Sequence, residues 1–244
     1  MKITYLGTSH GVPSADRFTT SFLLETQGRS YLIDAGAPVA KLLVEKNVEV
    51  ASVKALFNTH FHPDHIFGGL EFISLCNWYY KESDIDIFLP EDSGVVAVKN
   101  LITATDMKLD SERIRLHSYD ETFVYDDGCI KLTAFLNEHL KAVCRPSYSF
   151  CVESEGKTVF FSGDLSASLD DLPKILYQQH FDYVVVECAH FPAELLKEKL
   201  QGVNCDTLAV THIYPYEKFS QIQKFSEVFN FEIIIPSDGE VSVI

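Results

Sequence analysis

The sequence predicts an α/β fold in which helices cover two mixed β-sheets. Short runs of alternating apolar and polar residues, separated by turns that contain glycine, are typical of antiparallel hairpins. Other apolar runs are separated by segments with helical periodicity, and this order is typical of parallel strands joined by helices. The 244 residues contain no linker rich in proline, glycine and serine, and 46% of them are apolar. We therefore expect one domain, residues 1–244, with a sizeable core.

The first half of the chain is expected to open with strands and then to alternate strands with helices. Alternation predicts strands at 2–6, 19–25 and 29–34, with Gly28 in a turn. The next expected elements are a helix at 38–46, a strand at 54–58, a helix at 68–77, a strand at 86–89 and a helix at 94–101. Strands at 112–116, 122–125 and 129–135 follow, and Asp127-Gly128 is the expected turn of a hairpin.

The second half repeats this arrangement. A hairpin through Glu155-Gly156 is expected to join strands at 147–153 and 157–162. The later elements are expected to be a helix at 172–178, a strand at 183–187, a helix at 192–200, a strand at 208–211, a helix at 216–229 and strands at 232–235 and 241–244. Pro192 suits the start of its helix, where proline is favoured.

Four side chains that can bind a metal ion lie within six residues, His60-Phe61-His62-Pro63-Asp64-His65. Neutral imidazoles suit zinc and iron, and a carboxylate adds an oxygen ligand. The alternative is a polar loop that binds no metal, but such a group beside an apolar strand is costly without a partner. We expect these residues in the loop that leaves the strand at 54–58, where a rigid scaffold can hold ligands at its rim.

This run resembles the His-x-His-x-Asp-His signature of the metallo-β-lactamase-fold hydrolases, and the family's other motifs follow in the expected order. They are Asp34-Ala35-Gly36 for the early Asp-x-Gly, His139 some 74 positions after His65, Asp164 after an apolar strand, and His212 after another. Five elements in order argue against chance. The resemblance implies a four-layer αβ/βα sandwich whose site lies at one edge between the two sheets.

The resemblance also implies two divalent metal ions and assigns their ligands. His60, His62 and His139 are expected to hold one ion, Asp64, His65 and His212 the other, and Asp164 to bridge both. A bridging water with its pKa lowered toward about 7 then supplies hydroxide as the nucleophile. Asp64 and His190 are the candidate catalytic residues.

The ligand types alone accept zinc, iron or manganese. Relatives with a redox di-iron centre usually carry glutamate at the second position of the signature, so His62 favours hydrolytic Zn²⁺. Asp34 is expected to orient a ligand histidine. The alternative for Asp34 is a turn residue that caps the backbone near Gly36.

Within the superfamily, the opening Gly7-Thr8-Ser9-His10-Gly11-Val12-Pro13 resembles the ribonuclease Z branch. So does the strand that ends in Glu187-Cys188-Ala189-His190. That branch implies hydrolysis of phosphate or sulfate esters by tRNA-processing endonucleases, by cyclic-nucleotide and phosphoribosyl phosphodiesterases and by arylsulfatase-like enzymes.

Two departures bear on the substrate. The tRNA enzyme's basic, Gly/Pro-rich arm has no counterpart, because the segments between Asp164 and Glu187 and after His212 are short and acidic. Its Gly-His-Ser-Thr motif is also missing, since 192–206 contains no histidine. His190 is expected to replace that histidine as a proton donor, and the alternative is a surface histidine.

The net charge of −15 opposes binding of an extended polyanion, whose affinity comes from Lys and Arg. We therefore expect a phosphodiesterase that acts on a small phosphodiester, and we expect neither extended nucleic acid nor a membrane as a partner. No apolar run approaches the ~18 residues that span a membrane, the N-terminus does not resemble a signal peptide, and the six cysteines form no Cys-x-x-Cys pair, which favours the cytoplasm. A homodimer stays open.

The rival functions are a ribonuclease Z-type RNA endonuclease, a lactonase or other ester hydrolase, and a non-catalytic metal-binding scaffold. Two further features have two interpretations each. His10 is expected either to line the pocket or to lie at the surface, and Trp78-Tyr79-Tyr80 either to form an aromatic wall of the site or to pack at a helix end.

Overall fold

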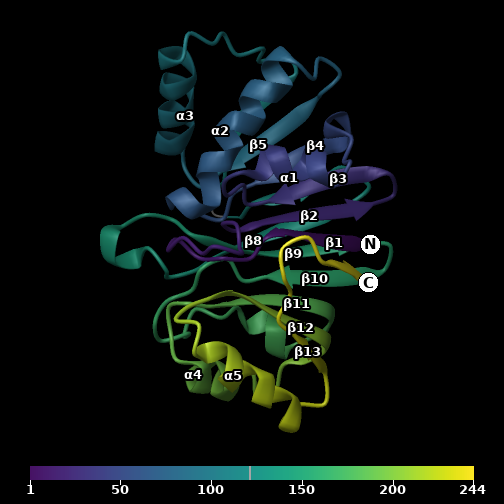
Figure 1. The fold of residues 1–244 in the computed structure, drawn as a ribbon, viewed down its shortest axis with the longest axis vertical. Coiled ribbons are helices and arrows are strands. Elements are labelled where there is room, and N and C mark those ends of the chain that lie inside the picture. The colour runs from purple at the N-terminus through teal and green to yellow at the C-terminus, as the bar shows by residue number, and fades with distance from the viewer. Residues whose placement is uncertain (121) are drawn as a thin grey trace.

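The computed structural model describes residues 1–120 and 122–244, and it contains two seven-stranded sheets that pack face to face (Figure 1). In order across the first sheet, the strands are β14 (Val241–Val243), β1 (Lys2–Gly7), β2 (Ser21–Thr26), β3 (Arg29–Ile33), β4 (Val53–Phe57), β5 (Ile85–Leu89) and β6 (Ile114–Ser118). In order across the second, they are β13 (Glu232–Ile234), β12 (Asn204–Ile213), β11 (His180–Cys188), β10 (Lys157–Phe161), β9 (Tyr148–Ser154), β8 (Lys131–Leu136) and β7 (Val124–Asp126).

Each sheet is antiparallel on one side and parallel on the other, as the mixed patterning predicts. Strands β14, β1, β2 and β3 pair antiparallel, and β3 to β6 pair parallel. In the second sheet, β7 to β10 pair antiparallel and β10 to β13 pair parallel. The expected hairpin turns at Gly28 and Glu155-Gly156 are present, and both glycines have positive φ, as tight hairpin turns require.

Helices cover the outer face of each sheet, which gives the expected four layers. The helices are α1 (Val39–Glu45), α2 (Pro63–Trp78) and α3 (Asp92–Ala104) over the first sheet, and α4 (Ala193–Lys199) and α5 (Lys218–Gln223) over the second (Figure 1). Three buried apolar clusters fill the spaces between layers. One lies between the sheets around Tyr5 and Phe150, one under α1 to α3 around Phe72, and one under α4 and α5 around Phe160 and Phe225.

The long helix of the signature region begins earlier than the sequence predicts. Gly68-Gly69 is the expected start, but α2 begins at Pro63, which occupies the first turn and suits it because proline lacks the N–H that a helix start leaves unpaired. Asp64 and His65 therefore lie in the first helical turn and not in a loop.

Two other predicted helices are wrong in extent. The helix expected at 172–178 is only the 3₁₀ turn η3 (Lys174–Tyr177), which follows Pro173. The helix expected at 216–229 consists of α5 followed by the 3₁₀ turn η4 (Lys224–Glu227). Each of the two elements buries one apolar residue, Ile222 in α5 and Phe225 in η4.

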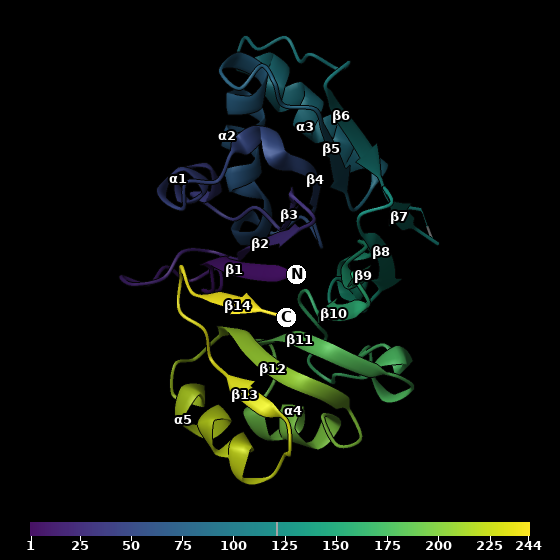
Figure 2. The same ribbon diagram turned by 90° about the vertical axis from the view of Figure 1, so that its right-hand side faces the viewer.

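Short turns and the chain ends complete the arrangement. The remaining 3₁₀ turns are η1 (Val50–Ser52) and η2 (Lys141–Val143). The N- and C-termini lie close together because β14 pairs with β1 (Figure 2). Among the helices that the structure describes, none combines the length and apolar character needed to cross a membrane.

Candidate metal centre

The seven predicted ligands lie together at one edge of the two sheets. His60 and His62 follow β4, and Asp64 and His65 begin α2. The other three come from the second sheet: His139 follows β8, Asp164 follows β10, and His212 is near the end of β12. Their ligand atoms form two groups, each with all separations within 4.8 Å, namely His60, His62, His139 and Asp164, and then Asp64, His65 and His212. This is the division that the resemblance implies.

Asp164 lies between the two groups. Its Oδ2 is 3.6 Å from His60 Nε2 and 3.4 Å from His212 Nε2, and its Oδ1 is 3.4 Å from His65 Nε2. Asp64 Oδ2 is 3.6 Å from the same nitrogen of His65. Two ligand atoms on one tetrahedral ion are about 3.4 Å apart when each bond is ~2.1 Å. The separations therefore fit side chains that share metal ions.

The hydrogen bonding of two buried histidine nitrogens also indicates a metal site. His60 Nε2 and His65 Nε2 are buried, and neither has a hydrogen-bond partner among the described residues. A buried polar atom left in this state costs ~1–3 kcal/mol. A metal ion on each nitrogen removes that cost. Imidazole nitrogens with carboxylate oxygens are the donor set of transition-metal centres, so the residues present fit the metals that the fold implies.

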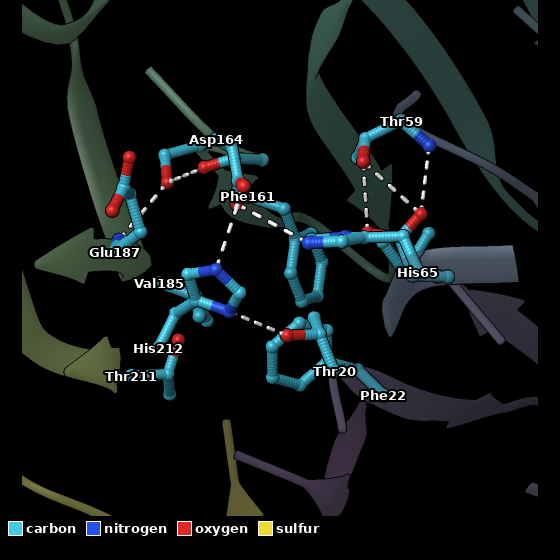
Figure 3. A pocket seen from close by; sticks show the side chains of 14 residues that line it. Thr20, Phe22, Thr59, His65, Phe161, Asp164, Val185, Glu187, Thr211 and His212 are labelled. Carbon is cyan, nitrogen blue, oxygen red and sulfur yellow. Dashed lines mark hydrogen bonds and ion pairs between the residues drawn. The ribbon is translucent and has the colours of Figure 1, made fainter. Parts of the chain in front are cut away.

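In His65 and His212 the Nδ1 atom contacts a residue outside the ligand groups, and this contact orients Nε2 toward Asp164 (Figure 3). His65 Nδ1 is 2.7 Å from Asp34 Oδ2, as expected for an aspartate that orients a ligand. His212 Nδ1 is 2.7 Å from Thr20 Oγ1. Asp34 also accepts hydrogen bonds from the backbone and hydroxyl of Thr59. Such outer contacts fix ring orientation and raise ligand basicity.

Close backbone packing brings Asp34 and His65 together. A Cβ on Gly68 in α2 would lie 2.4 Å from the Gly36 carbonyl oxygen, so the helix approaches the loop after β3 only because residue 68 is glycine. Asp34 and His212 both have positive φ, 58° and 52°, which is rare for residues with a side chain. Strained backbone at a candidate ligand, His212, and at Asp34, which orients another ligand, is typical of functional sites.

Electrostatics favour the metal-binding forms of His60, His139 and Asp164, whereas His65 has to lose a proton when a metal ion binds. Burial lowers the pKa of His60 well below its ordinary value, and burial also lowers the pKa of His139. Burial acts the same way on His65, but Asp164 and Asp34 outweigh it and raise that pKa well above the ordinary value. Burial raises the pKa of Asp164, yet the surrounding histidines hold it well below its usual range. Neutral imidazoles and an ionised carboxylate are the metal-binding forms.

His190 lies at the mouth of the same site. Its Nδ1 is 2.8 Å from Glu187 Oε1, its Nε2 is 3.8 Å from Asp164 Oδ2, and its ring centroid is 4.6 Å from that of His139. Glu187 is buried and also accepts the backbone N–H of Ala189. Burial lowers the pKa of His190, but the bond and charge of Glu187 raise it to about 9. The side chain is 33% exposed.

Of the two features with open interpretations, one reaches the site and the other does not. The His10 ring lies 5.9 Å from the His212 ring, and burial lowers the His10 pKa. Trp78-Tyr79-Tyr80 lies at the opposite end of the 16-residue α2, about 20 Å along the helix axis from Asp64 and His65 at its start. The aromatic-wall interpretation of these residues is therefore wrong.

Sequence reasoning missed several supporting residues. Thr59 precedes His60 directly, and that adjacency was an available signal. Thr20 lies 192 positions from His212, and no local pattern connects them. A cavity of about 20 Å³, large enough for one water, lies beside these ligands, and Thr20 and Thr59 are among the residues that line it. Figure 3 shows these lining side chains.

Comparison with known proteins identifies the family of the chain. The model of the family "Anti-Pycsar protein Apyc1" matches residues 1–197. The chain belongs to this family. A curated ribonuclease Z from Rippkaea orientalis is 27% identical over 181 residues, which is 73% of this chain and 56% of that protein. The chain thus spans about half the length of the curated relatives it matches.

Two solved structures share the fold. Human tRNase Z, short form, has a TM-score of 0.79 with 18% identity and covers 100% of this chain and 99% of its own. The metallo-β-lactamase fold protein YhfI from Bacillus subtilis has a TM-score of 0.78 with 18% identity and covers 99% of both chains. The predicted metallo-β-lactamase fold and the relationship to the ribonuclease Z branch are therefore confirmed.

Proposed function

We propose that this Apyc1-family chain is a metal-dependent phosphodiesterase that hydrolyses a small phosphodiester at a centre of two divalent ions, with Zn²⁺ preferred. One observation carries the proposal. Six imidazole and carboxylate side chains from both sheets surround a seventh, Asp164, and two of the buried nitrogens have no protein partner among the described residues. A binding scaffold that performs no chemistry has no need for both ligand groups.

In the proposed reaction the ligands divide as the geometry groups them. His60, His62 and His139 would hold the first ion and Asp64, His65 and His212 the second, with Asp164 placed between the two groups. Bound dications supply Lewis acidity, since they lower the pKa of water toward about 7 and polarise phosphate oxygens. Asp34 and Thr20 keep two of the ligand rings aimed at the centre.

His190 supplies the proton for the leaving group. Its Nδ1 donates to Glu187, which fixes the ring and stabilises its protonated form, while Nε2 faces the site at 3.8 Å from Asp164 Oδ2. A general acid at this place transfers the Nε2 proton to the departing alkoxide oxygen. The pair also replaces the Gly-His-Ser-Thr histidine that the sequence lacks.

A small substrate is supported by charge. The net charge is −15, and an extended polyanion needs Lys and Arg to neutralise its phosphates. One phosphodiester needs only the charge of the two ions. Cyclic nucleotides and aryl phosphodiesters are compact esters of this class.

The second candidate is a ribonuclease Z-type RNA endonuclease. It is favoured by the 27% identity to a curated ribonuclease Z, and the structural likeness to human tRNase Z concerns the fold alone. Under this candidate the same centre cuts a phosphodiester within RNA. The two candidates differ in substrate size and not in chemistry.

The test compares four substrates on zinc-loaded protein: bis-p-nitrophenyl phosphate, a 3′,5′-cyclic nucleotide, a lactone and a pre-tRNA, each at two salt concentrations. We expect turnover of the small phosphodiesters with little dependence on salt. Efficient tRNA cleavage with a log–log salt slope near −0.7 to −0.9 per phosphate contact establishes the endonuclease instead. Turnover of the lactone alone, or of nothing, overturns both candidates.

A further inference from the structure

An open aromatic corner lies directly beside the second ligand group. Tyr214 and Tyr216 follow the ligand His212 and are 40% and 43% exposed. Their ring centroids are 6.3 Å apart, and the ring planes meet at 78°. Neither hydroxyl has a hydrogen-bond partner within the residues that the structure describes. Two nearly perpendicular exposed rings therefore stand two and four residues beyond a metal ligand.

His10 links this corner to the metal centre. Its ring is buried, with its centroid 4.0 Å from that of Tyr214 and 5.9 Å from that of His212. Its Nδ1 accepts the Val12 N–H at 2.7 Å, which fixes the ring orientation. A Cβ on the next residue, Gly11, would lie 3.3 Å from Asp64 Oδ2, so this loop lies against a ligand. His10 is thus a fixed support between the ligands and Tyr214.

The loop that carries His10 is itself held at both ends. Asp238 accepts hydrogen bonds from the backbone N–H of Thr8 at 2.9 Å, from the Thr8 hydroxyl at 2.7 Å and from the Phe18 N–H at 2.5 Å. The Thr8 carbonyl in turn accepts the His212 N–H at 2.9 Å. The corner is therefore preformed, and a ligand that binds there does not have to order it.

We propose that Tyr214, Tyr216 and His10 form a subsite for a planar ring in the organic part of the phosphodiester, such as a nucleobase or an aryl group; this rests on the function proposed above. The ring stacks on Tyr214 with its edge toward Tyr216, while the phosphate reaches the ions beside His212. Aromatic stacking needs no positive charge, which suits a chain with a net charge of −15. His10 acts as a positioning residue for Tyr214.

The test uses two esters that release the same p-nitrophenolate. Bis-p-nitrophenyl phosphate carries a second ring, and methyl p-nitrophenyl phosphate carries none. In Tyr214→Leu we expect the KM for the bis ester to rise about five- to a hundred-fold, the range that stacking of one base contributes, while the KM for the methyl ester changes little. His10→Ala should shift the ratio of the two KM values in the same direction, and Tyr214→Phe, which keeps the ring, should restore the preference for the bis ester.

Tyr79→Leu is the matched control, because Tyr79 is 76% exposed and lies at the far end of α2. Equal losses on both esters in Tyr214→Leu, or no loss on either, overturn the subsite and leave the phosphodiesterase standing. Inactivity of the unaltered zinc-loaded protein on both esters overturns the proposed function and the subsite with it.

Discussion

The first half of the chain, from β1 to β6, forms most of the first sheet and holds four of the seven candidate ligands within six residues, from His60 to His65. The second half, from β7 onward, holds the other three, which are far apart in sequence. His139, Asp164 and His212 are separated by 25 and 48 positions, and each lies at or after the end of a different strand. The first set is arranged by one loop and one helical turn. The second set comes together only when the second sheet has assembled, because β9 lies between β8 and β10 and β11 lies between β10 and β12.

The halves also differ in what they contribute. The first gives a compact group of ligands, and the second gives the carboxylate that contacts both groups together with the His190–Glu187 pair. The outer contacts cross between halves, since Thr20 of the first holds His212 of the second. We infer that the first half provides most of the metal affinity and that the second converts bound metal into catalysis.

The largest effect is expected at Asp164. Asp164→Ala removes the carboxylate that faces both ligand groups, so the rate on bis-p-nitrophenyl phosphate should fall by more than about 10³-fold, beyond the 10- to 100-fold that loss of an outer contact costs. Elemental analysis of the same preparation should show loss of metal. The control is Asp182→Ala. Asp182 lies near the start of β11, at the end of that strand away from Glu187, and its Oδ1 is 2.7 Å from Lys157 Nζ. An active Asp164→Ala protein contradicts the bridging role.

His190→Ala is expected to lower the rate only for substrates whose leaving group has to be protonated. The rate on a 3′,5′-cyclic nucleotide, whose leaving group is an alkoxide, should fall about 10²- to 10⁴-fold. The rate on bis-p-nitrophenyl phosphate should change little, because p-nitrophenolate departs without a proton. His180→Ala, an exposed histidine at the start of β11, is the control. An unchanged rate on the cyclic nucleotide means that His190 is a surface histidine.

The same contrast explains what the sequence predicts well. His60 to His65 are recognisable because metal-binding residue types are contiguous, and Asp164 and His212 because each ends an apolar run. The start of α2 at Pro63 was missed because Gly68-Gly69 resembles a beginning. The Thr20–His212 contact and the corner at Tyr214 are products of tertiary packing, and no periodicity in the sequence encodes them.

A smaller effect should distinguish the outer contact to a ligand of the first half, His65, from the outer contact to a ligand of the second half, His212. Asp34→Asn removes a charged acceptor from His65 and Thr59, and Thr20→Val removes a neutral hydroxyl from His212 at nearly equal volume. Charge-assisted hydrogen bonds are roughly twice as strong as neutral ones. Asp34→Asn should therefore weaken zinc binding about 10- to 100-fold, and Thr20→Val by less than about tenfold. Competition with a chelator measures both, and a larger loss in Thr20→Val reverses the assignment of affinity to the first half.

The smallest effect is expected at Lys218, the first residue of α5. Its side chain connects α5 to the loop that carries His190, the proposed general acid. Its Nζ donates to the carbonyl oxygens of Cys188, Ala189 and Phe191 at 3.1, 2.9 and 2.7 Å, and these residues form the loop that carries His190. Lys218→Met keeps the side-chain stem and removes the ammonium, so the loop loses its shared donor while the metal ligands stay in place.

For Lys218→Met we expect kcat on the cyclic nucleotide to fall less than about tenfold, since general acid catalysis as a whole contributes ~10²–10⁴, while kcat on bis-p-nitrophenyl phosphate is retained. The free energy of unfolding should fall by ~1–3 kcal/mol, because three carbonyls lose a charged donor. Lys218→Arg, which can still donate to the loop, should recover part of the lost kcat. A role in stability alone lowers both rates together, and that result would place the position of His190 under the control of Glu187 and not of Lys218.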